Sequence, residues 1–155
     1  MKSSATSDGG RTTPVKNAFQ RGRELAARFD LDQRADLQPV LSALGVELVP
    51  WRFTGRLREV IIEGHVAIDD RLGDAWTRWL TAHALGHHAI HVGASLYLED
   101  WQWVNRNKAE RQAEEFAAGL LAGPDPRRPA TAKGLARRLG IPEPKAEFVL
   151  ATIPR

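Results

Sequence analysis

The sequence contains no cysteine. This absence excludes disulfide bonds and thiolate metal sites, so any metal ion must be held by histidine, aspartate or glutamate. A chain without cysteine is typical of a reducing compartment, and we expect a cytoplasmic protein. No apolar run approaches the roughly 18 residues that a membrane span requires, so no membrane association is expected. Residues 1–10 are polar and lack the apolar segment of a secretory signal.

The net charge is small, +3 over 155 residues, but it is unevenly distributed. Residues 125–155 contain seven Lys/Arg against three Asp/Glu, whereas residues 51–124 contain eight against ten. A basic segment can bind nucleic acid or an acidic partner, but it is more often a solvated helical surface. The charge pattern is therefore better explained by a solvated surface, and we do not expect direct nucleic-acid binding.

The hydrophobic residues, 43% of the chain, follow helical and strand periodicities in turn. They predict an α+β fold in which helices pack on a small antiparallel sheet. Residues 1–14 are expected to be a disordered tail, residues 15–124 one domain and residues 125–155 a helical C-terminal extension. The expected elements are helices at 15–29, 35–44, 75–91, 105–122, 132–139 and 144–152, strands at 46–53, 58–62 and 65–69, an irregular loop at 92–104 and a linker at 124–129.

The most informative segment is His83-Ala84-Leu85-Gly86-His87, inside a predicted helix. Residues at i and i+4 lie on one face of a helix, about 6 Å apart, so His83 and His87 can present two imidazole nitrogens to one ion. This spacing alone is a weak signal, because two partly buried helix histidines can share it. His91 lies four residues after His87, but each step of four residues moves a side chain about 40° around the helix axis. We expect His91 to support the ligands or to pack rather than to bind the ion.

A third ligand is expected from the helix predicted at 105–122, which carries an apolar face. That face consists of Ala113, Phe116, Ala117, Leu120 and Leu121. Glu110 lies one turn before it, on or beside the face, where a carboxylate needs a partner and a metal ion would be one. Glu114, one turn later, is the rival ligand. Either glutamate could otherwise belong to a solvated helix surface.

Two motifs together resemble the ImmA/IrrE family of zinc metallopeptidases. They are the segment Arg78–His88 and the later pattern Glu110-x-x-Ala113-x-x-Phe116-Ala117-x-x-Leu120-Leu121. The resemblance covers residues 35–124. It implies a minimal zincin-like peptidase domain, followed by a small helical C-terminal region, and a Zn²⁺ ion held by His83, His87 and Glu110. Family members act in the cytoplasm, and several cleave or inactivate helix-turn-helix repressors, so the resemblance implies an endopeptidase whose partner is a transcriptional repressor.

The chain departs from the family motif at Ala84. The family carries there the glutamate that accepts a proton from the metal-bound water. A positioned acid or base typically contributes about 10²- to 10⁴-fold to a rate, so we expect impaired peptide cleavage. Glu99, Asp100 or Glu114 would offset this loss if one of them reached that water. Alanine at this position fits either an engineered inactive variant or a natural pseudopeptidase.

Alternative functions and an alternative metal stay open. A metal-bound protein without hydrolytic activity could regulate its partner by capturing it. Residues 134–142 are similar to the first helix and turn of a helix-turn-helix, which would suit DNA binding, but residues 144–152 offer no Arg, Asn or Gln to read bases. Two histidines and a carboxylate also suit non-haem iron, although the helical spacing favours zinc.

Overall fold

The computed structural model describes residues 17–32, 34–62, 64–90, 94–98, 108–123 and 131–153. Several predictions lie outside these residues: the disordered tail at 1–14, the linker at 124–129, and the roles of His91, Glu99 and Asp100. In the described part of the chain, no helix is long and apolar enough to cross a membrane.

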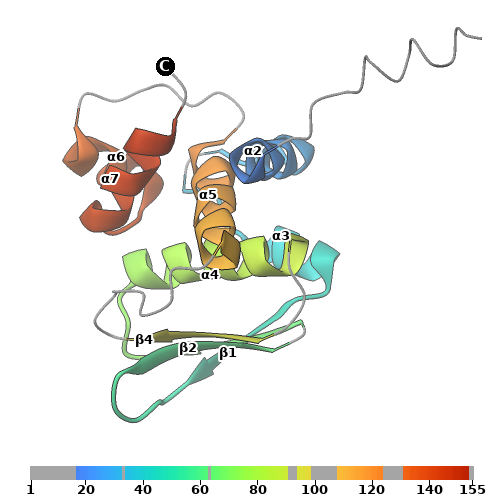
Figure 1. Cartoon of the computed structure of the whole chain (residues 1–155), viewed down its shortest axis with the longest axis vertical. Helices are drawn as coiled ribbons and strands as arrows, with labels where there is room; N and C mark the ends of the chain where they lie inside the picture. Colours follow the sequence, from blue (N-terminus) through green and yellow to red (C-terminus); the bar gives the residue numbers. More distant parts are fainter. Residues whose placement is uncertain are drawn as a thin grey trace, which may run out of the picture.

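The fold is α+β, as predicted, and the longest helix lies at its centre (Figure 1). This helix, α4 (Asp74–Ile90), lies across one face of the sheet. Beyond α4 lie α5 (Lys108–Ala122), α2 (Ala18–Arg28) and the C-terminal helices α6 (Ala132–Leu139) and α7 (Glu143–Thr152). The short α3 (Gln38–Leu44) leads into the first strand and ends at Gly45, which has the positive φ of 70° that glycine adopts readily.

The sheet has four strands in the order β1 (Glu47–Trp51), β3 (His65–Asp69), β2 (Leu57–Ile62) and β4 (Ala94–Leu98). The prediction of a purely antiparallel sheet is wrong, because β1 pairs with β3 in parallel. The irregular loop predicted at 92–104 is also wrong in part, because β4 forms inside it and pairs with β2. Both differences arise from pairing between strands that are distant in sequence, which local patterns do not specify.

Strands β2 and β3 form a hairpin. Ile62 pairs with His65, so two residues form the turn, and Gly64 has a φ of 78° that suits a tight hairpin. Because β1 and β4 flank this hairpin, its strands lie in the middle of the sheet.

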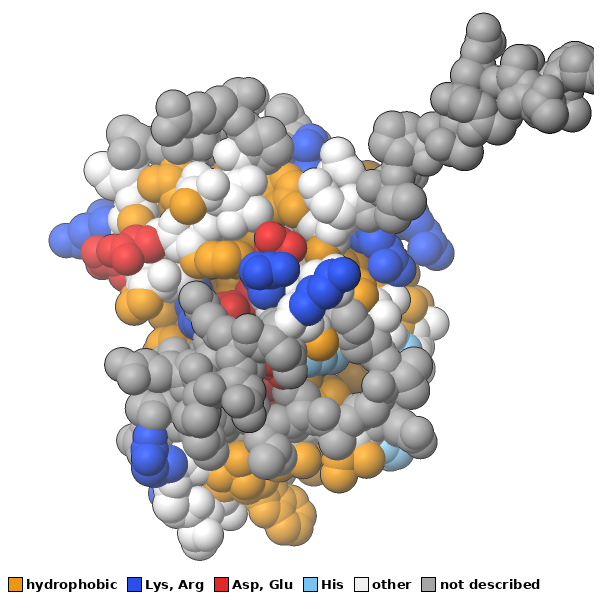
Figure 2. All heavy atoms as spheres, viewed as in Figure 1, with side chains coloured by type: hydrophobic (Ala, Val, Ile, Leu, Met, Phe, Trp, Pro, Cys, Tyr) orange, Lys and Arg blue, Asp and Glu red, His pale blue; other side chains and the backbone are white. Residues whose placement is uncertain are grey.

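The two faces of the sheet differ in burial. Along β2, Glu59 and Ile61 are buried, whereas Arg58 and Val60 are half-buried and Ile62 is 56% exposed. Hydrophobic side chains accordingly reach the surface at the sheet end of the molecule (Figure 2). The sheet therefore buries one face against α4 and leaves the other partly open to solvent, as sheets with antiparallel pairs commonly do.

Helix α4 is buried on both sides along its second half. Every residue from Trp79 to His87 is buried, because the sheet covers one side of the helix and α5 packs on the other. The same core extends into the C-terminal helices, where Leu135 and Val149 are fully buried. Arg78 connects these parts, since its guanidinium donates 2.7 Å and 2.6 Å hydrogen bonds to the carbonyls of Leu139 and Ala35. The extension beyond residue 125 thus packs into the core of the domain.

Three glycines let helices approach α5 backbone to backbone. A Cβ atom at Gly119 would lie 2.0 Å from the carbonyl oxygen of Phe19 in α2, and one at Gly22 would lie 2.2 Å from that of Phe116. On the other side, a Cβ atom at Gly86 would lie 2.7 Å from the carbonyl oxygen of Ala113. Atoms at these separations overlap, so glycine is required at each crossing.

We expect the substitution Gly119→Ala to destabilise the protein by about 1–3 kcal/mol, because the added methyl group overlaps main-chain atoms that cannot rotate away. Alanine favours an isolated helix over glycine by about 1 kcal/mol. A loss of stability in Gly119→Ala therefore reflects the steric overlap where α2 and α5 cross, and not helix propensity. Urea denaturation measures the effect. The control is Gly73→Ala, where an added Cβ meets no atom within 4 Å. Equal stability of the two variants would contradict the close crossing.

Candidate metal centre

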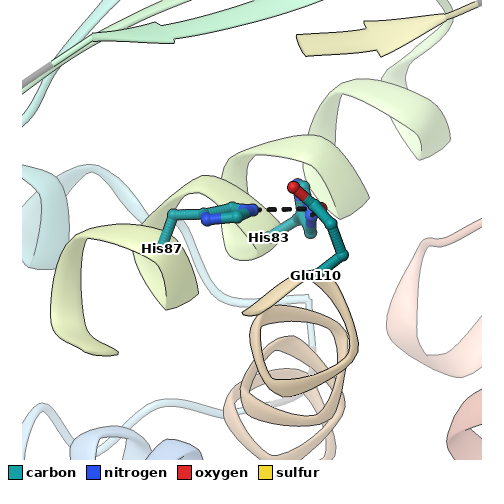
Figure 3. A group of neighbouring side chains, drawn as sticks. All are labelled: His83, His87 and Glu110. Atoms are coloured by element: carbon teal, nitrogen blue, oxygen red, sulfur yellow. Dashed lines mark hydrogen bonds and ion pairs between the residues drawn. The ribbon is translucent and has the colours of Figure 1, made fainter. Parts of the chain in front are cut away.

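Two histidines on α4 and one glutamate on α5 converge in the buried centre of the molecule (Figure 3). His83 is fully buried, and His87 and Glu110 are 8% and 9% exposed. The centres of the two imidazole rings lie 4.7 Å apart, and the rings are arranged edge to face. The predicted spacing on the helix therefore brings both rings to one side, toward α5.

Glu110 completes the group with a single oxygen atom. Its Oε2 lies 3.1 Å from Nε2 of His83 and 3.1 Å from Nε2 of His87. Ligand atoms around a tetrahedral zinc ion, with bonds of about 2.0–2.1 Å, are separated by about 3.3 Å. One potential ligand atom from each residue lies within 4.8 Å of the others. Two imidazoles and a carboxylate are zinc ligands, so these residues fit a divalent ion.

The packing of α5 against α4 explains why Glu110 reaches the histidines. Gly86 lies between the two histidines and has no side chain, so the carbonyl oxygen of Ala113 approaches the backbone of α4. Glu110 lies one turn before Ala113, in the first turn of α5. The glycine of the motif thus brings the second helix close enough for its carboxylate to meet both rings.

The buried side chains of His83 and Glu110 also form a charge pair. Burial alone would lower the pKa of His83, but hydrogen bonds to Glu110 and Glu59 raise the pKa to about 9. For Glu110, burial opposes ionisation, yet the hydrogen bonds from the two histidines hold the pKa of the carboxyl well below its usual range. A metal ion bound here must displace the proton that these groups share, because an imidazole coordinates as the neutral ring.

Glu59 is a member of the centre that the sequence interpretation missed. It lies on β2, is fully buried, and its Oε1 is 3.3 Å from Nδ1 of His83. Burial raises the pKa of Glu59, and the neighbouring His83 lowers it by a smaller amount. One signal was available: Glu59 interrupts the alternation of apolar residues on the buried face of a predicted strand, where an acid is costly.

Glu114 is not part of the group formed by His83, His87 and Glu110. It is 1% exposed, and its Oε2 accepts a 3.2 Å hydrogen bond from Nζ of Lys145 on α7. The structure therefore places Glu110, and not Glu114, beside the two histidines. Ala84, beside the first ligand, is fully buried and brings no titratable group to the centre.

Comparison of the sequence with protein-family models and with curated proteins returns no match. The likeness to the ImmA/IrrE peptidases therefore rests on the two motifs. Those motifs are the segments that the fold brings together, since the first contributes His83 and His87 and the second contributes Glu110.

Proposed function

We propose that this protein binds Zn²⁺ through His83, His87 and Glu110 and acts on a protein partner as an ImmA/IrrE-type metallopeptidase scaffold. The observation that carries the proposal is the position of one Glu110 oxygen, 3.1 Å from the Nε2 atoms of both histidines. The motif resemblance favours a helix-turn-helix repressor as the partner and the cytoplasm as the compartment.

The chain's own residues limit what this scaffold can catalyse. Bound zinc polarises a carbonyl group and lowers the pKa of water toward about 7. Ala84 has no group to accept or return a proton, and Glu114 is buried and accepts a hydrogen bond from Lys145. We therefore propose that peptide cleavage is reduced by about 10²- to 10⁴-fold relative to a centre with glutamate at position 84.

The intact ligand set beside the missing base also favours a second candidate. In it the metal-bound protein captures its partner and regulates it without hydrolysis. The two candidates differ in turnover: the second predicts tight association with the partner and no fragments, even after long incubation. Steady release of fragments by the chain with Ala84 would eliminate it.

DNA binding gains no support from the C-terminal helices. The exposed positions of α7 include Glu143 and Glu147, whose charge opposes approach to phosphate. Lys145 is 7% exposed and bonded to Glu114. Within the described residues of α6 and α7, the exposed basic side chains are those of Lys133 and Arg137.

Metal content of the purified protein tests the proposed function. We expect one zinc ion per wild-type chain after incubation with equal zinc and ferrous iron, as measured by elemental analysis. The variants His83→Ala and Glu110→Gln should lose the ion, because each removes one of three protein ligands.

The matched control is His88→Ala, which removes an exposed histidine from the same helix. This variant should retain a full complement of zinc. Wild-type protein without metal, or equal losses in the control and the ligand variants, would contradict the proposed centre.

A further inference from the structure

His83 lies between two carboxylates that come from opposite sides of α4. Its Nε2 is 3.1 Å from Oε2 of Glu110 on α5, and its Nδ1 is 3.3 Å from Oε1 of Glu59 on β2. Figure 3 shows the strands on one side of α4 and α5 on the other. The ring therefore has one nitrogen directed to the proposed metal position and the other directed to the sheet.

A neutral imidazole carries one N–H, and the nitrogen without hydrogen is the one that can bind a metal ion. If Nδ1–H donates to Glu59, then Nε2 presents its lone pair on the side of His87 and Glu110. A carboxylate at Nδ1 also fixes the rotation of the ring about its bond to the helix. Such outer hydrogen bonds commonly orient histidine ligands and raise their basicity.

We propose that Glu59 is a positioning residue that holds His83 as the Nδ1–H tautomer and directs its Nε2 at the metal ion. The inference rests on the proposed zinc centre and adds to it a group from the sheet that does not touch the ion. The strand β2 thereby becomes part of the metal-binding machinery, although the three ligands come from helices alone.

The energetic cost of Glu59 supports this role. The side chain is fully buried in a row with the apolar Ile61, and it pairs across the sheet with the apolar Ile68. Its second oxygen, Oε2, has no hydrogen-bond partner among the described residues. Burying a carboxylate costs free energy, and the hydrogen bond of the other oxygen, Oε1, to Nδ1 of His83 offsets part of that cost. The acid at this position is therefore explained by its bond to His83, the ring that it orients.

Two substitutions separate positioning from packing. Glu59→Leu removes the acceptor at nearly constant volume, and we expect it to weaken Zn²⁺ affinity by about 10- to 100-fold. Glu59→Gln keeps an oxygen that can accept the bond from Nδ1–H, so it should restore most of the affinity. Competition with a chromophoric chelator measures the affinities. The control Ile61→Val alters packing on the same strand face and should leave the affinity unchanged.

Two further readouts do not depend on affinity. The metal-free Glu59→Leu protein should be less stable to urea than the wild type, because the buried Nδ1 of His83 loses its hydrogen-bond partner, whereas metal-free Glu59→Gln should keep most of the stability. The absorption spectrum of the Co²⁺-substituted protein should change in Glu59→Leu and return toward the wild-type spectrum in Glu59→Gln, since it reports the ligand geometry.

Each outcome has a distinct meaning. Equal zinc affinity of the wild type and Glu59→Leu would overturn the inference while the zinc centre stands. Loss of affinity together with loss of metal-free stability, without recovery in Glu59→Gln, would show a packing role and also overturn it. A wild-type chain that binds no zinc would overturn the proposed function itself.

Discussion

The substitution Ala84→Glu is expected to raise zinc-dependent peptide hydrolysis by about 10²- to 10⁴-fold. Position 84 follows His83, the first proposed ligand on α4, and glutamate there supplies the proton acceptor that the proposed centre lacks. A carboxylate at position 84 would provide a proton acceptor and donor beside the proposed ligands, and zinc held by His83, His87 and Glu110 would provide a Lewis acid for the hydrolysis. A library of fluorescence-quenched peptides, incubated with the zinc-loaded proteins, measures the gain.

The controls for this prediction address size and metal separately. Ala84 is fully buried, so a longer side chain must be accommodated whatever its chemistry. Ala84→Gln introduces a similar volume without a basic carboxylate and should remain as slow as the parent chain. Adding His83→Ala to Ala84→Glu should abolish the gained activity. A folded, zinc-containing Ala84→Glu protein that is no faster than Ala84→Gln would contradict the predicted restoration.

The substitution Lys145→Met is expected to destabilise the protein by about 3–5 kcal/mol, because it removes the cation that compensates a buried carboxylate. Nζ of Lys145 lies 3.2 Å from Oε2 of Glu114, and both residues are buried. The ammonium group also lies 5.5 Å from the centre of the Trp79 ring. Methionine keeps most of the length and the apolar character of the lysine stem. The loss of stability therefore measures the removal of the ammonium charge.

A double-mutant cycle in urea denaturation isolates this ion pair. When Glu114→Gln is combined with Lys145→Met, neither partner remains charged, and we expect much of the stability to return. The double variant should therefore be more stable than Lys145→Met alone. Additive losses would show that the two side chains do not stabilise each other.

The ion pair also connects α7 with the helices that carry the proposed metal ligands. Glu114 lies one helical turn after Glu110, and Trp79 lies one turn before His83. The C-terminal extension is thus in contact with both helices on the side away from the sheet. If Lys145→Met displaced α4 or α5, it would weaken zinc binding as well.

The local features of this protein could be predicted from the sequence. The central helix was expected at 75–91 and is observed at Asp74–Ile90. The spacing of His83 and His87 depends only on helix geometry, so the prediction that both rings lie on one face is confirmed. The apolar face of the helix predicted at 105–122 left Glu110 and Glu114 as alternatives, and the motif resemblance implied Glu110, whose Oε2 lies 3.1 Å from both Nε2 atoms.

The features that depend on distant contacts could not be predicted. The parallel pairing of β1 with β3 and the presence of β4 depend on which strands meet. The partner of Glu114 lies 31 residues later in the chain, on a different helix. Glu59 acquires its role only because β2 is placed beneath α4, opposite Nδ1 of His83. A pattern within one element carries no information about such neighbours.

Crystals grown with zinc, and diffraction data collected at the zinc absorption edge, test the central claim most directly. The account predicts one anomalous peak per chain within bonding distance of Nε2 of His83, Nε2 of His87 and a carboxylate oxygen of Glu110. A well-ordered, zinc-saturated crystal with no peak between these side chains, or with the three side chains directed apart, would contradict it.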